Sequence, residues 1–176
     1  MGLVRAPDKV KLIAGLLSNN IKLFTAATSL LQNLFGKIDY ESDLVDFNCT
    51  DYYAHEMGAD IKRKFLSFKK LVDIDDIHTV KLKTNSLEGC FSESGKRQIN
   101  IDPGYLNMSK LVLFSTKDYS HRIYSGSGIY SEITLFYKDK KFNPWPWTYT
   151  DYKSSVYAGI FEKIRCLYKD GLNEGI

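Results

Sequence analysis

The N-terminal part of the chain carries two hydrophobic patterns of different period. Residues 10–17 form a compact apolar run that closes at the polar triplet 18–20, which is typical of a buried strand followed by a helix cap. Apolar residues then recur at helical spacing up to Gly36, namely Leu23, Ala26, Ala27, Leu30, Leu31 and Leu34. We therefore predict a strand over 10–17 and a helix over 21–35, whose leucine stripe, Leu30 included, packs on a mainly antiparallel sheet.

The rest of the chain divides into shorter segments. Extended segments are predicted around 38–47 and 65–72, and the length of the pattern over 75–91 favours a helix capped by Asp75. A short strand over 97–101 is expected to end at the turn Asp102-Pro103-Gly104, before an apolar run at 111–114. Residues 121–124 and 129–137 are predicted to pair as a hairpin, and a last helix is expected to stop near Gly171.

This order of elements predicts the fold class. A strand, helix, strand, strand, helix and strand come first, and a hairpin and a helix follow. We expect one α+β domain over residues 1–176, built on a ferredoxin-like β-α-β-β-α-β theme that a β-hairpin and a C-terminal helix extend. No linker, repeat or low-complexity segment interrupts the sequence.

Composition narrows the class of protein. With 176 residues, 44% of them hydrophobic and 26% charged, the chain has the balance of a globular domain and not of a disordered one. No apolar run approaches the roughly 18 residues that a membrane-spanning helix needs, so we expect no membrane partner. Three widely spaced cysteines argue against a disulfide framework, and the N-terminus lacks a signal-peptide profile. We expect a cytoplasmic protein.

Charge is unevenly distributed, although the net charge is only +3. Residues 36–60 are strongly acidic, whereas residues 61–100 are basic, most densely at Lys62-Arg63-Lys64 and Lys69-Lys70. One interpretation is two solvated faces that attract one another. The other is that the basic stretch 62–70 faces phosphate or RNA, with Phe65 and Phe68 between the bases.

Several catalytic signatures are absent. The sequence has no P-loop, no G-x-G-x-x-G, no G-x-S-x-G and no H-E-x-x-H. A P-loop GTPase, a Rossmann enzyme, an α/β-hydrolase and a zincin are therefore poorly supported. No close spacing of histidines and cysteines indicates a metal site, and the sequence identifies no cofactor.

A run of polar residues from 84 to 151 supplies the candidate chemistry. We predict a cleft for general acid–base chemistry on a phosphate-bearing ligand, in which His121 is the candidate proton donor and Glu132 orients it or neutralises Arg122 when no ligand is bound. The predicted ligand-binding residues are Arg97, Asn100, Asp102, Lys117 and Arg122. The alternative is structural, because a buried Glu132 is most simply paired with Arg122 or Arg97 and His121 can be an ordinary hydrogen-bonded histidine.

Several strings of the chain resemble one uncharacterised bacterial family, domain of unknown function 4416. The most specific string is Asn100-Ile101-Asp102-Pro103-Gly104-Tyr105-Leu106, and the resemblance extends from about Lys11 to Tyr168. Further strings that carry it are Glu56-Met57-Gly58, Lys117-Asp118, His121-Arg122-Ile123-Tyr124 and Trp147-Thr148-Tyr149. Similar sequences are often labelled GTP-binding, which the resemblance implies here without a P-loop to explain it.

Two functions follow as hypotheses. The first is a small protein that binds or processes a phosphate-bearing molecule, such as a nucleotide or phosphometabolite. The second is a non-catalytic RNA- or protein-binding module whose polar run is a structural network. A pocket that gathers His121, Arg122 and Glu132 favours the first, whereas burial of these groups in mutual pairs favours the second.

Overall fold

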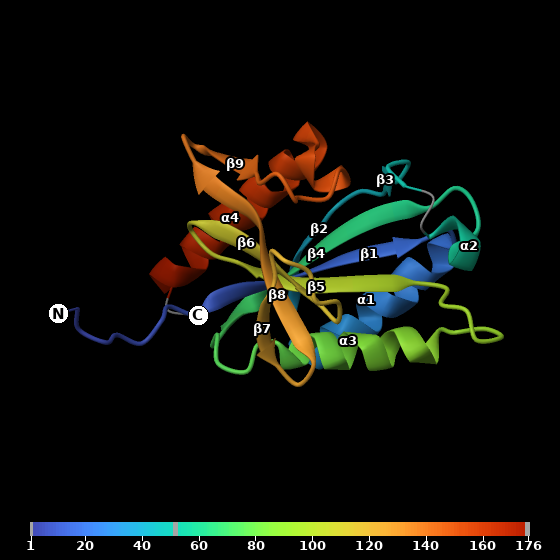
Figure 1. The fold of residues 1–176 in the computed structure, drawn as a ribbon, viewed down its shortest axis with the longest axis horizontal. Coiled ribbons are helices and arrows are strands. Elements are labelled where there is room, and N and C mark those ends of the chain that lie inside the picture. The colour runs from blue at the N-terminus through green and yellow to red at the C-terminus, as the bar shows by residue number, and fades with distance from the viewer. Residues whose placement is uncertain (1, 51–52, 175–176) are drawn as a thin grey trace.

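A computed structural model describes residues 2–50 and 53–174 of the chain (Figure 1). The strands are β1 (Val10–Ser18), β2 (Ile38–Glu41), β3 (Val45–Asp46), β4 (Lys62–Val72), β5 (Asn100–Leu106), β6 (Lys110–Ser115), β7 (Ile123–Gly126), β8 (Ile129–Lys138) and β9 (Lys141–Pro144). The helices are α1 (Ile21–Phe35), the single turn α2 (Ala54–Met57), α3 (Thr79–Cys90) and α4 (Ser155–Glu174), with a short 3-10 turn at Asp151–Lys153.

The described strands form one nine-stranded sheet, in the order β2-β4-β1-β5-β6-β8-β7, with β3 beside β4 and β9 beside β8. Every pairing is antiparallel. Because β4 lies between β1 and β2, and β1 lies between β4 and β5, the sheet holds two split β-α-β units. The predicted α+β class is confirmed, while the ferredoxin-like theme stays a prediction.

Helices cover both faces of the sheet. Figure 1 shows α1 and α3 side by side on one face and α4 across the other. The first face buries Phe24 and Leu31 of α1 and Leu87 of α3 against β1, β4 and β5. The second face buries an aromatic cluster in which Phe161 of α4 meets Phe65 of β4. This three-layer arrangement leaves the ends of the central strands to form the site.

Helix α1 has the predicted bounds but a different buried face. The side chain of Asn20 caps it by accepting a hydrogen bond from the backbone N–H of Lys22, and Gly36 ends it at a φ of 93°. The core-facing residues include Phe24 and Leu31, whereas Leu30 is 41% exposed. The prediction that Leu30 packs in the core is wrong, because the buried face of α1 consists of Phe24, Ala27 and Leu31, which recur at helical spacing and leave Leu30 at the side of that face.

One boundary of each of two other helices, α3 and α4, differs from the prediction. Helix α3 begins at Thr79 and not near Asp75, because Asp76 has a φ of 55°, which a right-handed helix does not accommodate. Helix α4 continues past Gly171 to Glu174. A glycine inside a helix costs only about 1 kcal/mol relative to alanine, so Gly171 alone does not end α4.

The predicted turn at Asp102-Pro103-Gly104 is wrong, because all three residues lie inside β5. This part of β5 pairs with β1, with Pro103 opposite Ala14. Strand β6 pairs with β5 only from Gly104 onward, so Pro103 has a neighbouring strand on one side only, a setting in which a strand tolerates proline. Gly104 is required by close approach: an added Cβ would lie 2.1 Å from the carbonyl oxygen of Val112.

The predicted β7–β8 hairpin is confirmed, although its first arm begins at Ile123, which places His121 and Arg122 just before the strand. A register shift between β6 and β8 lies opposite Thr134. Glu132 and Thr134 are both buried and hydrogen-bonded to each other at 3.2 Å. The hairpin thus places the carboxylate of Glu132 in the interior of the protein.

Candidate functional site

A cleft opens where the sheet divides. Strands β5 and β6 pair only between Gly104–Leu106 and Leu111–Leu113, so the start of β5 and the end of β6 diverge. The cavity between them has a volume of about 390 Å³. Five cationic side chains line it, namely Arg63, Lys81, Arg97, Lys117 and Arg122. Three anionic side chains line it as well, namely Asp102, Glu132 and Asp151. Tyr53, Tyr119 and Tyr149 are among its aromatic residues.

The predicted site residues mostly converge on this cleft. Those that line it are Arg97, Asn100, Asp102, Lys117, Arg122 and Glu132. His121 is outside the lining, because its ring stacks on Trp147 with centroids 5.7 Å apart. Its Nε2 lies 3.2 Å from Glu132 Oε2, so His121 reaches the cleft only through that carboxylate. The catalytic roles assigned to His121 and Glu132 stay predictions.

Arg122 is held in a buried network. Its Nε donates to Glu132 Oε2 at 2.8 Å, and its Nη1 donates to Ser115 Oγ at 2.8 Å and to the carbonyl of Lys117 at 2.9 Å. Its Nη2 donates to the hydroxyl of Tyr149. The side chains of Arg122 and Glu132 are 1% and 2% exposed, so the ion pair between them is buried. Arg122 therefore braces the wall of the cleft, since these bonds use four of its five N–H donors.

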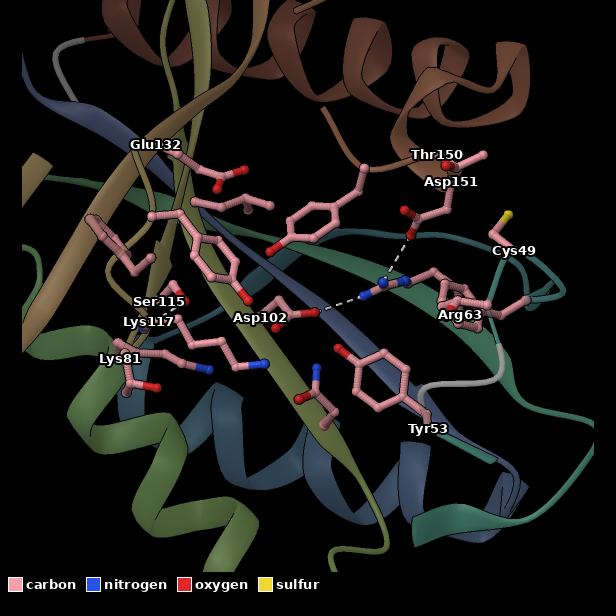
Figure 2. A pocket seen from close by; sticks show the side chains of 18 of the residues that line it. Cys49, Tyr53, Arg63, Lys81, Asp102, Ser115, Lys117, Glu132, Thr150 and Asp151 are labelled. Carbon is pink, nitrogen blue, oxygen red and sulfur yellow. Dashed lines mark hydrogen bonds and ion pairs between the residues drawn. The ribbon is translucent and has the colours of Figure 1, made fainter. Parts of the chain in front are cut away.

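A second arginine, Arg63, forms a centre that the sequence did not reveal. Its Nη1 donates to Asp102 Oδ2 at 3.1 Å and its Nη2 to Asp151 Oδ2 at 3.0 Å (Figure 2). The rings of Phe47, Phe65 and Tyr152 lie 5.3–5.7 Å from its guanidinium carbon. Three distant segments thus meet at one buried cation.

The alternation of inward and outward side chains along a strand could have indicated from the sequence that Arg63 is buried. Within the basic run 62–64, alternation along β4 turns the central residue inward and its neighbours outward. Lys62 pairs with Asp46, and Lys64 with Glu41. The acidic segment and the basic strand therefore attract one another at these positions, as one interpretation of the charge pattern held.

The two carboxylates on Arg63 have opposite pKa shifts. Burial tends to raise the pKa of Asp102, but the positive charges of Arg63 and Lys81 outweigh it and hold the pKa below its ordinary value. For Asp151 burial dominates, and the pKa is raised despite the same arginine. The two pKa values therefore shift in opposite directions, although Arg63 donates a hydrogen bond to both carboxylates.

Lys81 enters the cleft from the helix layer. It belongs to α3, is only 7% exposed, and donates from Nζ to the carbonyl of Ile101 at 2.8 Å. Glu88 lies 3.8 Å from the same ammonium group. Figure 2 shows Lys81 and Lys117 both extending toward the middle of the cleft. The sequence did contain a signal for Lys81, because this lysine lies on the apolar stripe of a predicted helix. A charged side chain at a buried position is costly unless it is paired, so such a lysine is a candidate functional residue.

Arg97 closes the cleft on the side of α2. Its Nη2 donates to Glu56 Oε2 at 2.7 Å, and its Nη1 to Asn100 Oδ1 at 2.9 Å. Glu88 also accepts a hydrogen bond from Arg97 Nη1 at 3.4 Å and another from the backbone N–H of Ile101 at 2.7 Å. These bonds fix the start of β5, so the position of Asp102 is well determined.

A family model matches residues 8–168, which is most of the chain. The chain belongs to the family called domain of unknown function (DUF4416). No curated protein and no solved structure matches it. In this DUF4416 chain the string Asn100–Leu106 is strand β5, whose first half lines the cleft.

Clusters of metal-binding side chains, helices that could cross a membrane and disulfides are all absent from the described residues 2–50 and 53–174 of the DUF4416 chain. Within these ranges no three His, Cys, Asp or Glu side chains are grouped so that they could hold a metal ion. No helix in the same ranges is long and apolar enough to cross a membrane. Cys49, Cys90 and Cys166 are free and exposed, and Cys49 lies at the rim of the cleft.

Proposed function

We propose that the cleft binds a small phosphate-bearing molecule, of which a nucleotide is one candidate. Its volume of about 390 Å³ falls in the range of small-molecule sites. Cationic side chains outnumber anionic ones in its lining, which favours an anionic ligand. The tyrosines of the wall supply flat rings on which a base or another ring can stack.

The burial of Lys81 is the observation that carries the proposal. An ammonium group has three donors, and this one makes a hydrogen bond of 2.8 Å to a carbonyl, while Glu88 stays 3.8 Å away. The charge is balanced by the ion pair with Glu88 and by nearby Asp102, whose pKa it lowers. A phosphate that entered the cleft would accept from the N–H donors that the carbonyl and Glu88 leave, and the buried position of the lysine would strengthen that contact.

The contacts assign different roles to the cations. Arg122 is committed to Glu132, Ser115 and Tyr149, so it shapes the wall. Lys81 and Lys117 extend toward the middle of the cleft and are the phosphate-binding groups that we propose (Figure 2). This moves the ligand-binding role from Arg122 to the lysines. The mutual pairing of His121, Arg122 and Glu132 is the arrangement expected of the second hypothesis, so for these three residues we adopt the structural role and the proposed binding rests on the lysines. In the basic stretch 62–70, Lys62 and Lys64 are paired with acidic residues, whereas Lys69 and Lys70 are exposed.

Thermal unfolding in the presence of ligands tests the proposal. The panel is orthophosphate, pyrophosphate, and nucleoside mono-, di- and triphosphates, measured with the parent protein and with Lys81→Met, Lys117→Met and Lys83→Met. Lys83 is an exposed lysine on the same helix and serves as the matched control. A ligand at 100 times its Kd stabilises the folded state by about 2.7 kcal/mol, which shifts Tm by about 5–10 °C in a chain of this size.

We expect at least one phosphate compound to raise the Tm of the parent and of Lys83→Met, and to lose most of this effect with Lys81→Met and Lys117→Met. Lys117 is exposed, so its substitution tests the site without disturbing a buried group. The proposal fails when no compound of the panel stabilises the parent. It also fails when both cleft variants respond as the parent does.

A further inference from the structure

The start of β5 places an amide and a carboxylate on one wall of the cleft. Asn100 and Asp102 are two positions apart in this strand, so their side chains project from the same face, while Ile101 is buried on the other face against the helices. Both polar residues line the cavity. Asp102 lies opposite Gly15 of β1, and a Cβ added to that glycine would lie 3.1 Å from Arg63 Nη1. The glycine therefore leaves the space through which the arginine reaches the carboxylate.

The amide of Asn100 presents an unused donor. The residue is 3% exposed, and its Oδ1 accepts a hydrogen bond from Arg97 Nη1 at 2.9 Å. Because a guanidinium group can only donate, this contact assigns the oxygen to the side of Arg97 and the nitrogen away from it. The Nδ2 atom is buried and makes no hydrogen bond with any residue that the structure describes. A buried N–H group without an acceptor costs stability, so an acceptor from outside the chain is expected there.

Asp102 supplies acceptors near that donor. Arg63 Nη1 donates to its Oδ2 at 3.1 Å, and a carboxylate has about four acceptor positions, so most of them stay open. The side chain is 25% exposed, and in the view of Figure 2 it lies between Arg63 and the ends of Lys81 and Lys117. Burial tends to raise the pKa of this carboxyl group, but Arg63, Lys81 and the nearby amide of Asn100 lower it overall. The group is therefore charged and acts only as an acceptor.

A hydroxyl group is the ligand group that satisfies both side chains. Its oxygen accepts from Asn100 Nδ2, and its proton is donated to Asp102. An ionised phosphoryl oxygen has no proton to donate, and the negative charge of Asp102 repels it. The two ends of the cleft thus differ in chemistry, with cations for a phosphate at one end and a donor–acceptor pair at the other.

We propose that Asn100 and Asp102 bind a hydroxyl group of the ligand, which makes the ligand a phosphorylated sugar or polyol, the ribose of a nucleotide included. The inference rests on the proposed function, since it takes the phosphate to be held by Lys81 and Lys117. A cavity of about 390 Å³ has room for a sugar and a phosphate together.

A bridging water in place of a ligand hydroxyl is the competing explanation, and matched pairs of phosphate compounds separate the two. Each pair differs in hydroxyl groups: glycerol phosphate with propyl phosphate, ribose phosphate with deoxyribose phosphate, and adenosine monophosphate with its dideoxyribose analogue. Isothermal titration calorimetry measures the Kd of each compound, and of orthophosphate, with the parent protein and with the variants.

Two variants each remove one partner of the hydroxyl group. Asn100→Asp keeps the oxygen that Arg97 binds and removes the N–H donor, whereas Asp102→Asn keeps an oxygen acceptor for Arg63 and removes the charge. The matched controls are Asn33→Asp on α1 and Asp170→Asn on α4, which make the same exchanges at exposed positions.

We expect at least one hydroxyl-bearing compound to bind the parent and both controls about 10-fold more tightly than its partner without the hydroxyl, as a hydrogen bond to a charged group predicts. In Asn100→Asp and Asp102→Asn this ratio of Kd values should fall toward one. The ratio cancels any effect of a substitution on the phosphate contacts. The comparison in the parent needs no variant, so it holds even where a variant fails to fold.

Two results would overturn the inference while leaving the proposed function intact. The first is a parent that binds phosphate compounds but prefers the hydroxyl-bearing member of no pair, which assigns the position to water. The second is a preference that either folded cleft variant keeps in full, which places the hydroxyl elsewhere. A parent that binds none of the compounds, orthophosphate included, refutes the proposed function itself, and the inference falls with it.

Discussion

Substitution of Arg122 by methionine tests whether this arginine braces the fold. The side chains of Arg122 and Glu132 are 1% and 2% exposed, and their Nε–Oε2 hydrogen bond measures 2.8 Å. Removing one partner of such a buried pair leaves the other charge without compensation, which costs about 3–5 kcal/mol. For a chain of this size, the loss corresponds to a decrease in Tm of about 6–20 °C. We expect Arg122→Met to show it.

The double variant Arg122→Met/Glu132→Gln separates the pair from the rest of the network. Because it leaves no buried charge unpaired, it should be less destabilised than the sum of the two single variants, with a coupling of about 1–3 kcal/mol. Urea denaturation followed by tryptophan fluorescence measures the free energy of unfolding of each protein. Lys138→Met, an exposed lysine at the end of β8, is the control and should change stability by about 0.5 kcal/mol or less. An Arg122→Met protein as stable as this control would refute the structural role and return Arg122 to the ligand-binding set.

Three further comparisons test the fold and the electrostatics. Leu31→Ala should destabilise the protein by about 3–5 kcal/mol in urea denaturation because Leu31 is fully buried, whereas Leu30→Ala at the exposed neighbouring position should cost under about 1 kcal/mol; equal losses would contradict the assigned helix face. Gly104→Ala should lower Tm severely because its Cβ would meet a backbone oxygen, while Gly159→Ala, in open space on α4, should raise stability by about 0.5–1 kcal/mol; tolerance of the first would disprove the close approach of β5 and β6. The lowered pKa of Asp102 contributes stability that is present above its unfolded value of about 3.9 and is lost as pH falls through the folded value, so Asp102→Asn should lose less stability between pH 5 and pH 3 than the parent, and identical pH profiles would contradict the shift.

Local patterns predicted the elements that depend on neighbouring residues. The apolar run of β1, the Asn20 cap and the glycine that ends α1 are all encoded within a few positions. The β7–β8 hairpin is equally local. These parts could be predicted because their stabilising contacts lie close in the sequence.

The features that the sequence did not reveal depend on long-range contacts. Pro103 and Gly104 have turn propensity, yet pairing with β1 keeps them in a strand. Lys81 belongs to a predicted helix, whereas Arg63 lies before the predicted segment 65–72, because β4 begins at Lys62. Only the folded sheet shows that both side chains line one cleft with Asp102. Asp151 closes the polar run in the sequence, and its partner Arg63 lies 88 positions away.

His121, Arg122 and Glu132 illustrate how far residue types alone can lead. The sequence grouped them correctly, because all three are in contact in the structure. It did not show which of them faces the ligand space. That depends on the direction of each side chain, which the stacking of His121 on Trp147 and the four acceptors around Arg122 determine.

The most direct test of phosphate binding in the cleft is anomalous diffraction from crystals equilibrated with tungstate, a heavy tetrahedral oxyanion that resembles phosphate. We predict the strongest anomalous peak inside the cleft, within hydrogen-bonding distance of Lys81 Nζ and on the same side as Lys117. Peaks confined to the exposed lysines of β4, such as Lys69 and Lys70, with none in the cleft, would contradict the account.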